Sequence, residues 1–266
     1  NTLYILSSYS GNTEEPLSVY EEVKKRGAKI MGITSSHSKN KLEKLMIDNG
    51  IPGFIFSPEN NPSEQPRLGL GYSIFGMLSL FKKAGLINLS EDKVREVIRM
   101  LRKNNSSLKI EMEKEKNKAK AIANELYGKQ PIVIGGEFLT GNIRAVRNQM
   151  CENSKNLCYW LDLPNLNHYL LESLENPKGN SKQVVFWFID SKFYNPRVQK
   201  RSKLTREVVE KNNIKASSTE LTGKDKIIQS FEMLQLGSWV TFYLAMLNDI
   251  DPVNIPWVDW FKKKLK

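Results

Sequence analysis

Short apolar runs and amphipathic stretches alternate along this chain. Apolar runs that end at polar or glycine-rich turns are typical of strands, and apolar residues that recur every three or four positions are typical of helices. In the first part of the chain this pattern predicts strands at 3–6, 28–34 and 54–56, helices at 16–26 and 38–49, and a loop at 57–65. Strands that alternate with helices favour a parallel sheet with helices on both faces.

The middle of the chain is predicted to be helical. A mostly apolar helix is expected over 68–84, and its composition predicts that it is buried. Ser90 is expected to cap a helix that runs to about Asn104, where an Asn-Asn-Ser-Ser run interrupts it. A further helix is predicted over 108–127, and these last two helices are expected to connect two halves of the chain.

The second half repeats the alternation of the first. It predicts strands at 131–136, 184–189 and 214–221, a loop at 161–166, and helices at 142–154, 168–174, 204–212, 224–247 and 257–265. The predicted fold class is therefore α/β, with two doubly wound αβα domains in tandem, each built on a parallel sheet. The predicted segments are an N-terminal domain over 1–88, a helical connector over 89–127 and a C-terminal domain over 128–266.

The composition is that of an ordinary globular protein, with 266 residues, of which 40% are hydrophobic and 26% charged. No apolar run reaches the length of a membrane span and no charged-then-apolar leader opens the chain, so we expect a cytoplasmic protein without a membrane partner. Two cysteines and two histidines give neither a disulfide framework nor a clustered zinc-ligand spacing. We therefore expect no metal.

The formal net charge of +11 raises the alternative of nucleic-acid binding. The lysines, however, alternate with glutamates on amphipathic helices, as over 111–116, and no basic stripe is interleaved with stacking aromatic residues. Solvated helix faces account for most of the charge. We expect no nucleic-acid partner.

A hydroxyl-rich run follows the first predicted strand and precedes the first predicted helix. The residues that could bind an anion there are Ser8, Ser10, Gly11, Asn12 and Thr13. The first N–H groups of a helix have no intrahelical partner and lie at the positive end of its dipole, and a glycine lets the backbone approach a ligand closely. Any single one of Ser10, Asn12 or Thr13 could instead cap the helix. Together these residues exceed what one cap requires, so they indicate a phosphate site.

Glu152 and His168 are the candidate acid–base pair. A carboxylate and an imidazole suffice to move a proton between adjacent carbons while a sugar ring opens. Each also has an ordinary explanation, because a glutamate on a lysine-rich helix is often solvated and a histidine after a loop is often a cap or a surface residue. The residues alone leave both alternatives open.

Two stretches resemble a known family. Ser8, Ser10, Gly11, Thr13 and Glu15 match the phosphate-binding motif of sugar isomerase (SIS) domains. The segments 147–155 and 163–168 resemble the catalytic signature of the bifunctional phosphoglucose/phosphomannose isomerases. The resemblance implies that Glu152 is the base that moves the proton between C1 and C2, and that His168 opens the ring from the other subunit of a homodimer.

Two further matches extend the resemblance over nearly the whole chain. Arg67, in a Gln-Pro-Arg segment, resembles the family's arginine beside the enediolate, where a fixed guanidinium stabilises growing negative charge. A surface position before a helix is the alternative for this arginine. Lys262, in Phe-Lys-Lys-Lys-Leu, resembles the family's active-site lysine of the last helix, and the adjacent Lys263 and Lys264 are the other choices.

The resemblance implies two SIS-type domains and an isomerase that interconverts glucose 6-phosphate, mannose 6-phosphate or both with fructose 6-phosphate, without a cofactor. The sequence departs from the family beside His168, at Asn165 and Tyr169. The family's first strand and glycine-serine loop would precede Asn1, so we expect the N-terminal domain to lack its first strand and the sequence to be truncated. The alternative function is a non-catalytic SIS module that binds a sugar phosphate as a sensor.

Overall fold

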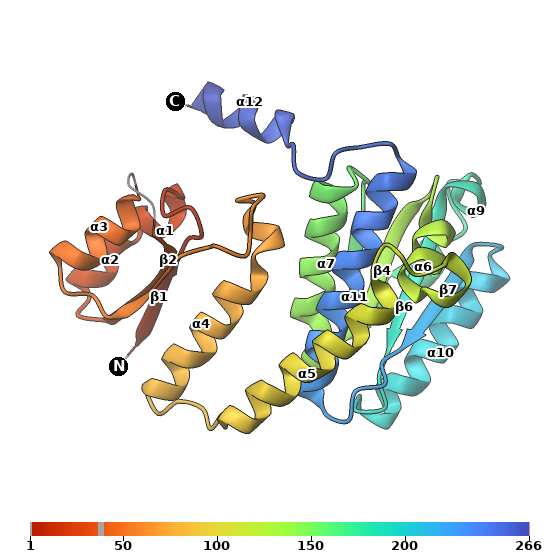
Figure 1. The fold of residues 1–266 in the computed structure, drawn as a ribbon. Coiled ribbons are helices and arrows are strands. Elements are labelled where there is room, and N and C mark those ends of the chain that lie inside the picture. Colours follow the sequence, from red (N-terminus) through yellow and green to blue (C-terminus); the bar gives the residue numbers. More distant parts are fainter. Residues whose placement is uncertain (1, 37–39, 266) are drawn as a thin grey trace. The chain divides into compact units, whose positions relative to one another are not determined.

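The computed structural model describes residues 2–36 and 40–265, and the predicted helix start at Ser38 lies outside these residues. The chain divides into two compact units, residues 1–93 and 94–266 (Figure 1). Each unit is built on a wholly parallel sheet. The predicted α/β class with two parallel sheets is confirmed.

The sheet of the first unit has three strands in the order β1-β2-β3. Its strands are β1 (Leu3–Ser7), β2 (Lys29–Ser35) and β3 (Gly53–Phe56), each within a few residues of its predicted place. The helices between them are α1 (Glu14–Ser18), α2 (Tyr20–Lys25) and α3 (Lys41–Asp48). The single helix predicted over 16–26 is therefore wrong, because Val19 separates two short helices.

Apolar side chains cover both faces of this first sheet. One cluster joins Leu6 to Tyr20, Leu42 and Met46 of the helices α2 and α3. The other lies under α4 (Leu70–Lys83) on the opposite face, and its members are Tyr9, Ile33, Phe56 and Leu80 (Figure 1). The expectation that the apolar helix α4 is buried is wrong, since only Gly76 and Leu80 of it are buried. Within the first unit, the sheet packs against only one side of α4.

The helix α5 (Glu91–Leu108) begins at its predicted cap, where the Ser90 hydroxyl accepts the Lys93 N–H at 3.2 Å. The predicted break after Asn104 is wrong. The hydroxyls of Ser106 and Ser107 donate to the carbonyls three residues earlier, at 2.7 and 2.9 Å, and so stay compatible with a helix. The next α-helix is α6 (Lys118–Leu126), after the short 3₁₀ turn η2 (Lys114–Lys116).

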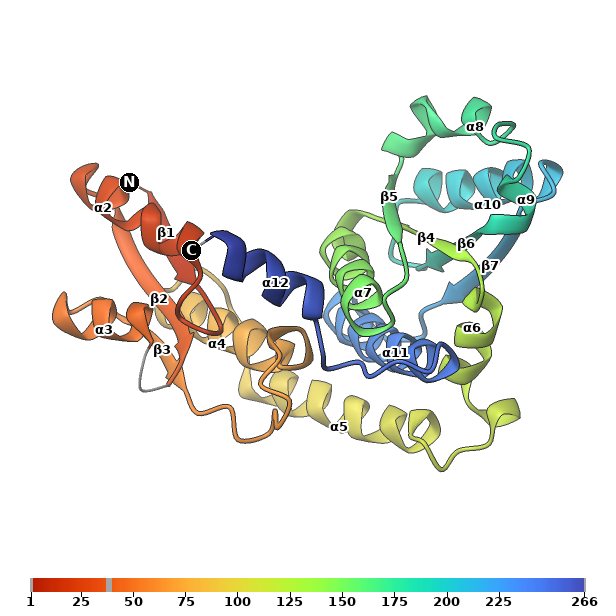
Figure 2. The same cartoon turned by 90° about the horizontal axis from the view of Figure 1, so that it is seen from above.

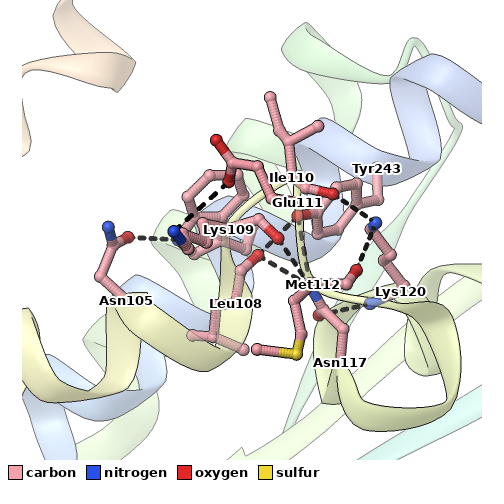
Figure 3. Close-up of polar contacts among 10 residues, drawn as sticks. Asn105, Leu108, Lys109, Ile110, Glu111, Met112, Asn117, Lys120 and Tyr243 are labelled. Atoms are coloured by element: carbon pink, nitrogen blue, oxygen red, sulfur yellow. Dashed lines mark hydrogen bonds and ion pairs between the residues drawn. The ribbon is translucent and has the colours of Figure 1, made fainter.

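A polar junction joins the end of α5 to the start of α6 (Figure 3). The Asn117 amide and the Tyr243 hydroxyl both donate to the Leu108 carbonyl, at 2.9 and 2.5 Å. The Lys120 ammonium donates to the carbonyls of Ile110 and Met112, at 2.7 Å each. Main-chain carbonyls between the helices thus find side-chain partners.

The sheet of the second unit has four strands in the order β5-β4-β6-β7. Its strands are β4 (Gln130–Gly136), β5 (Tyr159–Leu163), β6 (Val184–Asp190) and β7 (Lys215–Glu220). The strands predicted at β4, β6 and β7 are confirmed. The loop predicted over 161–166 is wrong at its start, because the half-exposed edge strand β5 continues through Asp162 to Leu163, both paired with β4.

Helices lie on both faces of the second sheet, with α10 (Pro196–Lys211) on one face and α7 (Thr140–Asn153) and α11 (Lys226–Leu247) on the other (Figure 2). The shorter elements are η3 (Glu137–Leu139), η4 (Asn165–His168), α8 (Leu170–Ser173) and α9 (Asn180–Gln183). The chain closes with α12 (Pro256–Leu265). The core between the layers holds the fully buried Trp187, Phe186 and Phe188 of the central strand β6. None of the described helices is both long enough and apolar enough to cross a membrane.

The helices α7 and α11 pack unusually closely. A Cβ atom added to Gly237 of α11 would lie 2.2 Å from Cγ2 of Val146 in α7. Side-chain hydrogen bonds join the same helices, among them those from Gln149 to Ser238 and from Asn153 to Thr241, both at 3.0 Å. Only glycine allows this approach, so the contact sets the position of α7 on α11.

We predict that Gly237→Ala destabilises the second unit by about 1–3 kcal/mol, because the added methyl overpacks the α7–α11 contact. The matched control is Gly141→Ala, near the start of α7, where an added Cβ meets nothing within 4 Å. That change should be neutral or should stabilise the unit by about 0.4–1 kcal/mol, because alanine reduces the conformational entropy of the unfolded chain. Urea unfolding measures both. Equal free energies of unfolding for the two variants would contradict the prediction.

Candidate active site

The hydroxyl-rich loop follows β1 at the carboxyl edge of the first sheet, where ligands of parallel α/β sheets bind. The hydroxyls of Ser8 and Thr13 are hydrogen-bonded at 2.7 Å, and Ser8 also accepts the Thr13 N–H at 3.4 Å. Ser8 is buried, whereas Ser10, Asn12 and Thr13 are exposed. The loop therefore exposes hydroxyl and amide groups to solvent, while the buried Ser8 holds Thr13 in place.

Helix capping does not account for these hydroxyls. Thr13 occupies the N-cap position of α1 but its side chain makes no capping hydrogen bond. The Ser10 hydroxyl accepts the Asn12 N–H at 3.3 Å, and the Asn12 carbonyl oxygen Oδ1 accepts the Lys41 N–H at 3.3 Å. The side chains shape the loop, and the start of α1 depends on none of them.

Gly11 has a structural requirement in addition to the predicted close approach of a ligand. Its φ angle is +69°, which favours glycine, and an added Cβ would lie 1.5 Å from Oδ1 of Asn40. Asn40 caps α3 by accepting the Glu43 N–H at 2.9 Å. The glycine thus makes room for the cap of the next helix.

Arg67 lies at the same edge of the first sheet, in the 3₁₀ turn η1 (Pro66–Leu68) that follows β3. It is 6% exposed, so the alternative of a surface arginine is excluded. Its guanidinium donates to the Gln65 side chain at 2.7 Å. The Asn61 amide donates to the Tyr9 hydroxyl at 2.7 Å, which ties the segment before Arg67 to the hydroxyl-rich loop.

Glu152 lies in the last turn of α7, in the second unit, and is half-buried. It lines a cavity of about 400 Å³ between the end of α7 and the segment that leads into α12. The other lining residues are Cys151, Lys155, Ile250, Asp251, Asn254, Ile255, Pro256, Trp257 and Val258. A glutamate that lines a cavity of this size is a candidate for proton exchange with a small ligand.

The two cysteines near this cavity are free thiols. Burial raises the pKa of the Cys158 thiol well above its usual range. Cys151 is half-buried and lines the cavity, so it is the more accessible of the two. Within the described part of the chain, no three His, Cys, Asp or Glu side chains are grouped so that they could hold a metal ion.

His168 lies at the end of η4, after β5, and is exposed. Its presentation depends on the residues before it, because Leu166 is buried and the Asn167 amide donates to the Thr205 hydroxyl at 2.7 Å. Asn165 and Tyr169, where the sequence departs from the family, are both exposed. The side chains that anchor this turn are therefore those of Leu166 and Asn167.

The structure does not bring Glu152 and His168 together within one chain. Glu152 precedes β5 and His168 follows it, at opposite ends of the same strand. Because a strand advances about 3.3 Å per residue, the five residues of β5 separate its ends by roughly 17 Å. The two groups therefore lie at different edges of the second sheet.

Lys262 lies in α12, and its side chain is exposed, as are those of Lys263 and Lys264. The cavity beside Glu152 is lined by the start of this helix, up to Val258. Lys262 is four residues further on, or about 6 Å along the helix axis. The cavity residues Lys155, Asp251 and Trp257 were not predicted, since no local pattern links the end of α7 to a segment a hundred residues later.

The chain is similar to known proteins over nearly all of its length. Residues 115–265 match the family described as the bacterial phospho-glucose isomerase C-terminal SIS domain. A bifunctional phosphoglucose/phosphomannose isomerase of Caldicellulosiruptor bescii is 33% identical over 269 residues, covering 99% of this chain and 76% of the relative. The enzyme of the same name from Aquifex aeolicus is 31% identical, covering 97% of this chain and 74% of the relative.

Solved structures share the fold at low sequence identity. A glucose-6-phosphate isomerase like protein from Thermus thermophilus matches with a TM-score of 0.61 at 16% identity, covering 99% of this chain and 87% of its own. The tagatose-6-phosphate ketose/aldose isomerase of Escherichia coli matches with a TM-score of 0.62 at 12% identity, covering 94% and 70%. The matched family covers more than half of the chain, and the relatives match along nearly all of it. The chain therefore belongs to the bifunctional phosphoglucose/phosphomannose isomerase family of SIS-domain proteins.

Proposed function

We propose that this protein is an aldose–ketose isomerase that interconverts glucose 6-phosphate and mannose 6-phosphate with fructose 6-phosphate. The observation that carries the proposal is the half-buried Glu152 at the wall of a cavity of about 400 Å³. The family match supports it, because the relatives from C. bescii and A. aeolicus carry both isomerase activities in their names.

The substrate phosphate binds the hydroxyl-rich loop. Ser10, Asn12 and Thr13 are exposed there, and the buried Ser8 holds the Thr13 hydroxyl in place at 2.7 Å. Hydroxyls at the carboxyl edge of a parallel sheet suit an anionic ligand. Arg67 at the same edge stabilises the negative charge that develops on the enediolate.

Glu152 takes the proton from C2 of an aldose 6-phosphate and returns it to C1. The substrate's own carbonyl acidifies this proton, so the step requires no cofactor. Because the C1–C2 bond of the enediolate is a double bond, C2 is planar, and the other epimer forms when C2 is reprotonated on its opposite face. The same base thereby serves both glucose 6-phosphate and mannose 6-phosphate.

Ring opening falls to His168 of a second copy of the chain. The separation of Glu152 and His168 at opposite ends of β5 supports this assignment, because one chain alone does not hold both groups at one site. Lys262 of α12 is the proposed partner at the ring oxygen and hydroxyls. The working unit is then a homodimer with two equivalent sites.

We predict that Glu152→Gln lowers kcat for fructose 6-phosphate by about 10²–10⁴-fold, because the amide cannot act as a base. The substrate KM should change by no more than about threefold, since the shape of the side chain is kept. Turnover is measured with glucose 6-phosphate and mannose 6-phosphate quantified separately. A sensor module would bind the sugar phosphate without turnover in the wild-type protein too, and that result would favour the alternative function.

We predict that two inactive variants restore activity when they are mixed. Glu152→Gln and His168→Ala should each be inactive alone, but a mixed dimer contains one site with both wild-type groups. After unfolding and refolding together in equal amounts, the mixture should recover about a quarter of wild-type activity, because half of the dimers are mixed and each has one intact site. Recovery of no activity would contradict the shared site.

We predict that Arg67→Met lowers kcat by about 10²–10³-fold through the loss of a fixed charge beside the enediolate. Arg67→Lys should restore part of this loss, since it keeps the charge but not the planar guanidinium. Both variants also lose the hydrogen bond to Gln65, so a thermal unfolding curve serves as the control for folding. Equal activity of the Met and Lys variants would show that charge is not what Arg67 contributes.

A further inference from the structure

Lys155 occupies a position that usually takes glycine. It follows the end of α7 with a φ angle of +53°, in the left-handed region that is unfavourable for a residue with a Cβ. The Asn156 N–H donates to the Met150 carbonyl at 3.3 Å, so the chain turns back on the helix here. This turn brings the lysine side chain back to the end of α7.

The Lys155 ammonium donates to three main-chain carbonyls. Two belong to the last turn of α7, Glu152 at 2.9 Å and Asn153 at 3.4 Å. Carbonyls at a helix C-terminus have no intrahelical partner and lie at the negative end of the dipole, so a cation is favourable there. The third carbonyl is that of Asp251, at 2.9 Å, from the segment that leads into α12.

Asp251 in turn shapes that segment. Its carboxylate accepts the Val253 N–H at 2.8 Å and the Asn254 amide at 2.7 Å. Both Lys155 and Asp251 line the cavity beside Glu152, together with Trp257 at the start of α12. One ammonium group therefore bonds the two walls of this cavity to each other.

We propose that Lys155 is a positioning residue for the isomerisation. It fixes the main chain of Glu152 relative to the segment 250–258, and so sets the distance between the base and the start of the helix that carries Lys262. This inference rests on the proposed function. Lys155 needs no contact with the substrate for this role, because it acts on the backbone of both walls.

A second link keeps the fold intact when Lys155 is changed. The Asn248 amide donates to the Ser154 carbonyl at 3.0 Å and to the Asn156 side chain at 2.7 Å. The end of α11 thus stays joined to the end of α7 without the lysine. A variant at position 155 is expected to fold, with its change confined to the cavity walls.

Lys120 offers a matched control. It also bridges main-chain carbonyls, those of Ile110 and Met112, but at the junction of α5 and α6 (Figure 3). It does not line the cavity beside Glu152. Lys120→Met therefore removes the same kind of contact without changing the cavity walls.

The test compares Lys155→Met, Lys155→Arg and Lys120→Met with the wild-type protein. Lys155→Met should raise amide hydrogen exchange over residues 248–256 and lower kcat by about 10–100-fold, with KM changed by less than about threefold, because displacement of a catalytic group by about 1 Å is costly to the rate. Lys155→Arg should restore most of the kcat, since its guanidinium can donate to the same carbonyls. Lys120→Met should leave kcat within about twofold of wild type.

Two results would overturn the proposal. One is unchanged exchange over residues 248–256 in Lys155→Met, which would mean that the ammonium does not hold the segment. The other is increased exchange with unchanged kcat in an active enzyme. If the wild-type protein itself shows no turnover, the proposed function fails, and the exchange comparison still decides whether Lys155 joins the two walls.

Discussion

The contact between α7 and α11 is the constraint on which the proposed catalytic centre depends. Gly237 lets the two helices approach, and the pairs Gln149–Ser238 and Asn153–Thr241 link their polar side chains along the same seam. Buried polar pairs are satisfied only in one register, because a shifted helix would leave each group without its partner. The end of α7 is thereby fixed on the second sheet, and Glu152 with it.

The direction of the chain after α7 then determines where Glu152 and His168 lie in the second unit. The helix α7 runs back along the sheet, so Glu152 lies where β5 begins, and the turn with His168 lies where β5 ends. Parallel βαβ topology imposes this separation on any base at the end of a helix and any group after the next strand. The homodimer proposed above would place His168 of a second chain at the site that holds Glu152.

Local pattern was least reliable where polar residues lie inside a helix or a strand. Ser106 and Ser107 were expected to break a helix, yet their hydroxyls bond within α5 and the helix continues. The edge strand β5 extends past its apolar residues into a stretch that was predicted to be a loop, because pairing with β4 holds Asp162 and Leu163 in the sheet. For Gly11, which was predicted from chemistry to admit a ligand, the structure adds a packing requirement beside Asn40.

The sequence by itself determined the α/β class, the two parallel sheets and the family, because short apolar runs, helical periodicity and spaced motifs are local properties of the chain. It also identified Glu152 and Arg67 as candidates. Only the tertiary structure decided that Arg67 is buried, that Glu152 lines a cavity, and that Lys155 bonds its two walls. These facts depend on contacts between segments distant in sequence, and such contacts are set by packing in three dimensions, which no local pattern encodes.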